Sequence, residues 1–216
     1  RYKGVQMKKS LIVAGILLAG STLVAGDIQP FVGVDLSNVE ADYTNKINGT
    51  ITYNGNSLSN YSADGTAKDT AIGFKTGAII DNKHRVYISY GKYSDDDGKL
   101  TNTLLNYDYL FKSGNDKITP YIGLHAGQSK IEVNLDDDYE ISKTGVAYGL
   151  QGGLIYHATT NVDLEIGVSY TMIDAEAKSA TVNASLYNGN LTLTNVQITS
   201  EVENASRAFI GLNYKF

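Results

Sequence analysis

Residues 162–172 of the chain read VDLEIGVSYTM, and this stretch decides the fold. Its apolar side chains recur at every second position, with Asp163, Glu165, Gly167 and Ser169 between them. An alternation with a period of two predicts a β-strand with one apolar and one polar face. The length of the stretch also matches the roughly 9–11 residues that a tilted strand needs to cross a bilayer.

The same alternation returns along the whole chain, separated by turn-forming residues. The segments that carry it are 32–36, 72–80, 86–91, 105–111, 122–126, 146–154, 162–172 and 208–216. About eight strands therefore follow one another with no helical pattern between them. The sequence predicts an all-β chain whose neighbouring strands are antiparallel and run up and down in order.

The connections between these segments alternate strictly between short and long. Tight turns lie around Asn82, Gly114 and Thr160, whereas the long connections span 38–68, 94–99, 130–143 and 174–203. Nothing in a soluble sandwich requires this alternation. A barrel of the bacterial outer membrane has short periplasmic turns, long extracellular loops and both termini in the periplasm. The pattern therefore predicts a closed transmembrane β-barrel of about eight strands.

The strand faces are inverted relative to those of a soluble protein, because the charged residues share one face with glycine and serine. These residues are Lys75, Arg85, Asp108, Asp163, Glu165, Arg207 and Lys215. We expect them to line the lumen, which in an eight-stranded barrel is just wide enough for side chains to fill. The uniformly apolar face must then meet lipid, where a sheet has to be closed because open backbone edges are not tolerated.

Charges in such a lumen are expected to pair, since an unpaired buried charge is costly. Asp163 at the start of the seventh segment and Lys215 at the end of the eighth lie at similar height, with Glu165 within reach. Arg85 and Asp108 form a second candidate pair across adjoining segments. A lumen closed by these pairs is predicted to conduct little or nothing.

Residues 1–26 have the features of a leader followed by a cleaved signal peptide that starts at Met7. Lys8 and Lys9 precede the apolar run 11–20, which is too short for a spanning helix. The mature domain is expected to comprise residues 27–216. It has 18 − 4 = 14 basic and 23 acidic residues, a net charge of −9. Such a chain offers no basic face for nucleic acid.

Composition also limits the chemistry of the chain. It contains no cysteine, which excludes disulfides, thiol nucleophiles and cysteine-ligated metals. The acidic runs 95–97 and 136–138, with Glu140, could offer oxygen ligands to Ca²⁺ or Mg²⁺. Neither run has the ligand spacing of an EF-hand, and solvated acidic loops are the simpler interpretation. We expect no metal site and no cofactor.

The three histidines raise the question of an enzyme, because histidine, serine and a carboxylate together can cleave esters. His84 and His157 adjoin the tight turns, and His125 is expected to face the lumen, where it completes a hydrogen-bond network. The chain has no G-x-S-x-G motif. We therefore predict that it is not an enzyme.

The two longest connections share the tetrapeptide Tyr-Asn-Gly-Asn, at 53–56 and at 187–190. Asn-Gly is a strong signal for a type I′ hairpin turn. Both connections are therefore expected to continue the barrel strands outward as hairpins, with their tips at Asn54-Gly55 and Asn188-Gly189. Two coincidental Asn-Gly turns in disordered loops are the alternative.

The end of the chain carries a resemblance to a known family. Ile210, Leu212, Tyr214 and Phe216 are apolar at every second position and resemble the signal by which the barrel assembly machinery recognises its clients. With the alternating segments, residues 27–216 resemble the small OmpA/OmpX and opacity-type outer-membrane β-barrels. The resemblance implies a bacterial outer-membrane location, with lipid and lipopolysaccharide as surroundings. It differs from full-length OmpA because no peptidoglycan-binding domain follows.

Members of that family range over adhesion, membrane integrity and host interaction, so the resemblance implies no single activity. The leading hypothesis is a structural or surface-interaction role, adhesin-like, carried by the extracellular loops toward an unidentified surface ligand or host partner. A narrow diffusion channel is the first alternative. A lipid-modifying outer-membrane enzyme is the second.

Overall fold

The computed structural model describes residues 27–94, 98–111, 117–136, 139–179, 181–186 and 189–216. The predicted leader and signal peptide lie outside these ranges. These ranges contain nine strands: β1 (Ile28–Tyr53), β2 (Asn56–Ile80), β3 (His84–Ser94), β4 (Gly98–Leu110), β5 (Ile118–Asp136), β6 (Tyr139–His157), β7 (Val162–Lys178), β8 (Val182–Leu186) and β9 (Leu191–Lys215). Among the described residues, no helix is long and apolar enough to cross a membrane.

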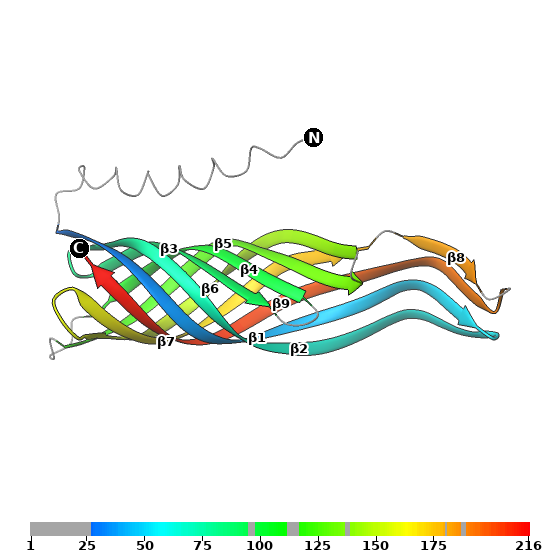
Figure 1. The fold of residues 1–216 in the computed structure, drawn as a ribbon, viewed down its shortest axis with the longest axis horizontal. Coiled ribbons are helices and arrows are strands. Elements are labelled where there is room, and N and C mark those ends of the chain that lie inside the picture. The colour runs from blue at the N-terminus through cyan, green and yellow to red at the C-terminus, as the bar shows by residue number, and fades with distance from the viewer. Residues whose placement is uncertain (1–26, 95–97, 112–116, 137–138, 180, 187–188) are drawn as a thin grey trace, which may run out of the picture.

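Eight of the strands form a closed ring. Each strand from β1 to β7 pairs antiparallel with the next, β7 pairs with β9, and β9 pairs back with β1. β8 stands outside the ring, because it pairs only with β9 among the described strands. The prediction of an all-β, eight-stranded antiparallel barrel is confirmed (Figure 1).

The two faces of the barrel wall differ in the way that the sequence predicts. On the outside, apolar side chains are solvent-accessible, for example Ile166 at 59% and Val168 at 62%. On the inside, Arg85 is 1% and Asp108 0% exposed. Burial of charges behind an exposed apolar wall is stable only where lipid covers that wall.

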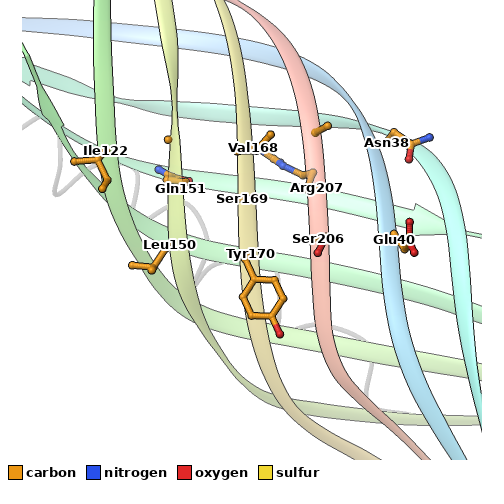
Figure 2. Close-up of a pocket in the computed structure, with 12 residues that line it drawn as sticks. Asn38, Glu40, Ile122, Leu150, Gln151, Val168, Ser169, Tyr170, Ser206 and Arg207 are labelled. Atoms are coloured by element: carbon orange, nitrogen blue, oxygen red, sulfur yellow. The ribbon is translucent and has the colours of Figure 1, made fainter.

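A shallow groove on the outer wall shows where the apolar belt ends (Figure 2). Its lining changes along the groove from the apolar Ile122, Leu150 and Val168 to the polar Asn38, Glu40 and Ser206, with Tyr170 between the two groups. A tyrosine ring with one polar tip suits the boundary between lipid and water. On β1 the belt therefore ends after Leu36.

The strands differ greatly in length, and this difference shapes the molecule. β1, β2 and β9 have 26, 25 and 25 residues, whereas β3 has 11 and β4 has 13. The long strands run far beyond the ends of the short ones (Figure 1). The long connections 38–68 and 174–203 are thus mostly strand, because their apolar and threonine-rich residues suit a pleated sheet.

The turn between β1 and β2 has the backbone conformation that its Asn-Gly sequence predicts. Asn54 and Gly55 have φ values of 47° and 82°, and two successive positive values are what a type I′ turn requires. In the second tip Gly189 has a φ of 88°, whereas Asn188 lies outside the described residues. β1 and β2 join through the two residues Asn54-Gly55, with Tyr53 and Asn56 paired, and β8 and β9 flank the second tip.

Candidate functional site

The lumen is organised around Glu165 on β7, which is 3% exposed. Lys75 Nζ on β2 lies 2.7 Å from Glu165 Oε2, and Arg85 on β3 donates to both carboxylate oxygens at 3.1 and 2.8 Å. Asn213 on β9 donates to Oε2 at 2.9 Å. One carboxylate thus receives hydrogen bonds from three different strands across the lumen.

Arg85 joins this group to a second carboxylate. Its Nε donates to Asp108 Oδ2 at 2.8 Å, so the pair that the sequence predicts is present. Asp108 also accepts a hydrogen bond from Gln151 at 2.6 Å. The guanidinium carbon lies 4.7 Å from the centre of the Tyr121 ring and 5.1 Å from that of Tyr87. Arg85 is therefore held by two carboxylates and by aromatic faces.

The predicted pair of Asp163 and Lys215 is also present, with 2.9 Å between Nζ and Oδ1. Glu165 does not join this pair, because it binds Lys75 and Arg85. The place beside Asp163 is taken by His157, whose Nδ1 lies 2.7 Å from the same oxygen.

Arg207 pairs with Asp35, which is not among the charges expected from the sequence to line the lumen. Its NH1 lies 3.4 Å from Asp35 Oδ1, and its guanidinium carbon lies 4.3 Å from the centre of the Phe209 ring. Asp35 is 4% exposed. It alternates with Val34 and Leu36 in the sequence, so the period of two was the signal that could have identified it.

The charges of the lumen balance. Four cations, Lys75, Arg85, Arg207 and Lys215, meet four carboxylates, Asp35, Asp108, Asp163 and Glu165, and every one of them has an opposite charge within 4.0 Å. A buried ion pair is tolerated when its members are paired and hydrogen-bonded. The network therefore fills the lumen without leaving a net charge that would attract ions.

A layer of apolar side chains closes the lumen toward the ends of the long strands. Its members include Val39, Tyr93, Leu100, Ile131 and Val202, all at most 9% exposed. The sequence does not predict this layer, because the apolar positions of the alternating segments are expected to face lipid. Side chains in such a layer pack closely and leave few voids larger than a water molecule.

Coupling between Asp163 and Lys215 is our first testable prediction. Asp163→Asn and Lys215→Met are each expected to destabilise the barrel, and the double variant less than the sum, with a coupling free energy of about 1–3 kcal/mol. Urea unfolding of the refolded protein measures it. The exposed pair of Glu40 and Lys68, 2.9 Å apart, serves as the control with a coupling below about 1 kcal/mol. Equal, near-zero coupling in both cycles would remove the pairing argument.

The histidines take part in hydrogen bonds with residues of other strands. His125 Nε2 lies 2.9 Å from Thr171 Oγ1, and His84 Nδ1 lies 2.8 Å from the Tyr107 hydroxyl. His157 links Thr119 at 2.9 Å to Asp163 at 2.7 Å.

The hydroxyl–imidazole–carboxylate order around His157 is that of many hydrolases. Here the Lys215 ammonium lies 2.9 Å from the same Asp163 oxygen that His157 contacts. The Asp163 oxygen is thus shared between the imidazole and a buried ion pair. We therefore assign the chain of hydrogen bonds a structural role, joining the ends of β5, β6, β7 and β9.

The acidic runs predicted as loops fall mostly outside the described residues, and the side chains of Asp136 and Glu140 are not described either. Within the described part of the chain, no group of three or more histidine, aspartate or glutamate residues is arranged to hold a metal ion. The absence of a metal in the acidic runs stays a prediction.

Beyond the lipid belt, β2, β1, β9 and β8 form a four-stranded sheet, which we call the outward sheet. Residues paired directly across two strands lie on the same face of a sheet. The strand register therefore shows which residues lie on each face of the outward sheet. One face carries Ile51, Tyr53, Leu58, Ala184, Leu186, Leu191 and Leu193. The other carries Thr50, Thr52, Ser57, Ser59, Ser185, Thr192 and Thr194.

The side chains of one face form hydrogen bonds with each other, whereas those of the other face are apolar and exposed. On the hydroxyl face, Thr50 and Ser59 are 2.8 Å apart, and Thr52 and Ser57 2.9 Å. On the apolar face, Tyr53 is 58% and Leu58 50% exposed. A cluster of exposed apolar side chains at a sheet tip is a typical interaction surface.

Charge is distributed unevenly along the outward sheet. Residues 47–63 and 179–200 contain no Asp, Glu, Lys or Arg. Closer to the membrane, Lys46 Nζ lies 2.9 Å from Glu201, and Thr44 donates to Asp64 at 2.9 Å. Lys46 lies beyond the lipid belt, and its pKa is raised by the hydrogen bond to Glu201 and by the negative charge of Glu201. The sheet thus has a charged base and an uncharged tip.

Comparison with known proteins gives a consistent result. Residues 72–189, more than half of the chain, match the family described as "Opacity family porin protein". Neisserial surface protein A is 22% identical, with 87% of this chain and 97% of that chain covered and a TM-score of 0.56. The outer membrane protein OprG from Pseudomonas aeruginosa is 17% identical over 87% of this chain and 96% of its own, with a TM-score of 0.53. No curated protein matches.

Proposed function

Because the chain belongs to the Opacity family of porin proteins, and is an outer-membrane β-barrel, we propose that it acts through its outward sheet and not through its lumen. The observation that carries the proposal is the uncharged, two-faced tip, whose end lies about 55 Å along β1 from the lipid belt, since 17 residues separate Leu36 from Tyr53 at about 3.3 Å each. A surface so far from the membrane can meet molecules outside the cell. The role is a surface interaction of the adhesin type.

The state of the lumen supports this assignment over a diffusion channel. Paired charges fill it around Glu165, and the apolar layer of Val39, Ile131 and Val202 closes it toward the outward sheet. Water and ions cross a barrel only through a continuous polar passage. The two packed layers interrupt any such passage.

The membrane surroundings and the assembly route are part of the same proposal. Tyr214 is 48% and Phe216 68% exposed on the lipid side of the last strand, with their ring centres 5.2 Å apart. Exposed aromatic side chains at this end are available to the barrel assembly machinery. We also propose that lysines at the base of the outward sheet, such as Lys46 and Lys68, contact lipopolysaccharide phosphates; their side chains are 43% and 64% exposed, and each pairs with a glutamate in the structure.

The orientation in the membrane gives the second prediction. The tip at Asn54-Gly55 and the tip at Gly189 face the outside, whereas both ends of the barrel domain and the tight turn at Asp81-Asn82 face the periplasm. A protease added to intact cells is expected to cut only within the outward sheet. Cleavage of intact cells at the tight turns alone would reverse the orientation.

The role of the outward sheet is tested by shortening it. Thr44 and Asp64 are direct partners on β1 and β2, so a two-residue Asn-Gly turn between them removes the tip of this hairpin and keeps the barrel. Cells that express the wild-type or the shortened chain are applied to arrays of matrix proteins and glycans. Wild-type cells are expected to be retained on at least one surface, and shortened ones not. Equal retention of both on every surface would contradict the proposal.

A further inference from the structure

The outward sheet has two open edges. Residues 56–72 of β2 pair with β1 on one side, and β3 joins β2 only from Gly73 onward. At the opposite edge, β8 pairs with β9 alone among the described strands. An open edge exposes backbone N–H and C=O groups that readily pair with another strand.

Neither edge at the tip has the usual protection against pairing. Natural edge strands are shielded by charges or proline. Ser57-Leu58-Ser59 on β2 and Val182–Leu186 of β8 contain neither. Side chains along both edges alternate between the two faces in step. Ser57 and Ser185 lie in one row of residues paired across the sheet, and Leu58 and Ala184 lie in the next row. The edges are therefore complementary to each other.

The direction of the strands decides which partner fits. Along the sheet, β2 runs toward the membrane, β1 away from it, β9 toward it and β8 away from it. Because the number of strands is even, the two edges run in opposite directions. Two copies that stand upright in the same membrane therefore bring β8 of one antiparallel to β2 of the other. An odd number of strands would have offered only parallel pairing between these edges.

Charge also favours a second copy at the tip. The mature chain has a net charge of −9, from 14 basic and 23 acidic residues, so two copies repel each other over most of their surface. The tip, with residues 47–63 and 179–200 free of charge, is a region where two copies can meet without that repulsion.

We propose that two copies in one membrane associate edge to edge, with β8 of each paired to β2 of the other. A two-fold axis along the membrane normal forms both contacts at once and leaves neither edge open. The joined strands make an eight-stranded closed sheet whose interior can take up the apolar faces, Leu58 and Leu186 among them. This association goes beyond the proposed surface role and does not depend on the ligand.

Cross-linking tests the proposal, and the absence of natural cysteine makes the test specific. Ser57→Cys and Ser185→Cys chains are expressed together in one outer membrane and oxidised with copper phenanthroline. The expected result is a band of twice the monomer mass when both variants are present, and little of it with either variant alone. Heat-dependent mobility on a gel verifies that each variant has folded.

Two controls separate edge pairing from random collision. Thr52→Cys lies in the same row and on the same face as Ser57 but on the central strand β1, so with Ser185→Cys it should cross-link far less. Ala184→Cys lies on the opposite face of β8 and should not react with Ser57→Cys. Equal yields for Ser57→Cys and Thr52→Cys, homodimers of each variant alone, or no dimer between folded Ser57→Cys and Ser185→Cys chains would each overturn the proposal.

Discussion

Replacement of Glu165 by alanine is expected to lower the free energy of unfolding by about 3–5 kcal/mol, the usual cost of breaking a buried ion pair. The Glu165 side chain is 0% exposed and pairs with both Lys75 and Arg85. Arg85 would keep Asp108, whereas Lys75 has no other carboxylate partner among the described residues. The variant therefore leaves a buried ammonium without a counter-charge.

Urea unfolding of the refolded barrel measures this effect. Glu40→Ala is the matched control, because the Glu40 side chain is 48% exposed and pairs with Lys68 at the surface. Its loss should change the unfolding free energy by less than about 1 kcal/mol. If Glu165→Ala behaves like Glu40→Ala, Glu165 does not hold the lumen together.

Gly123→Ala is expected to be the second severe substitution, at about 3 kcal/mol or more. A Cβ at this position would lie 1.9 Å from Asp108 Oδ1 and 2.5 Å from the backbone oxygen of Tyr107. The backbone cannot yield, so Asp108 must move away from Arg85 and Gln151. Steric crowding and a broken ion pair would then add together.

The same substitution at Gly152 is the control for Gly123→Ala. A Cβ there would have one neighbour within 4 Å, the backbone oxygen of Tyr121 at 3.3 Å. Gly152→Ala is expected to cost less than about 1 kcal/mol, and both variants are compared by urea unfolding and by heat-dependent gel mobility. Equal stability of the two variants would show that the lumen has room that the structure does not give it.

The sequence was sufficient for the barrel and for part of its lumen. The period of two, with charged residues on one face, follows directly from the inversion that lipid imposes on a sheet. Asp163 and Lys215 could be paired because both lie close to a strand end, where height in the membrane is easily counted. Arg85 and Asp108 are direct cross-strand partners on β3 and β4.

Contacts across the lumen could not be predicted in the same way. Glu165 binds Lys75 and Arg85, which lie on strands that are not its neighbours in the ring. Such contacts depend on the shear of the barrel, which a strand pattern does not specify. The apolar layer with Val39 and Ile131 could not be predicted for another reason. Alternation separates the two faces of a strand, but where both faces are apolar it does not show which one points into the lumen.

The outward sheet was predicted only as a pair of hairpins. The tip at Asn54-Gly55 follows from turn chemistry, which acts between neighbours in the chain. The pairing of the edge strand β8 with β9 shifts its register at Asn195, and the pairing of β1 with β2 shifts at Gly49 and Asn60; all three residues have positive φ values. Bulges of this kind leave little trace in a single sequence.

Single-channel recording in a planar bilayer tests most directly whether the protein works through its outward sheet or through its lumen. With Glu165 paired to Lys75 and Arg85 and with the apolar layer above them, the purified barrel is expected to show no steady conductance steps. Protein incorporation is verified by the folded mobility of the same preparation. Large, steady conductance steps from the wild-type chain would contradict the account and favour a diffusion channel.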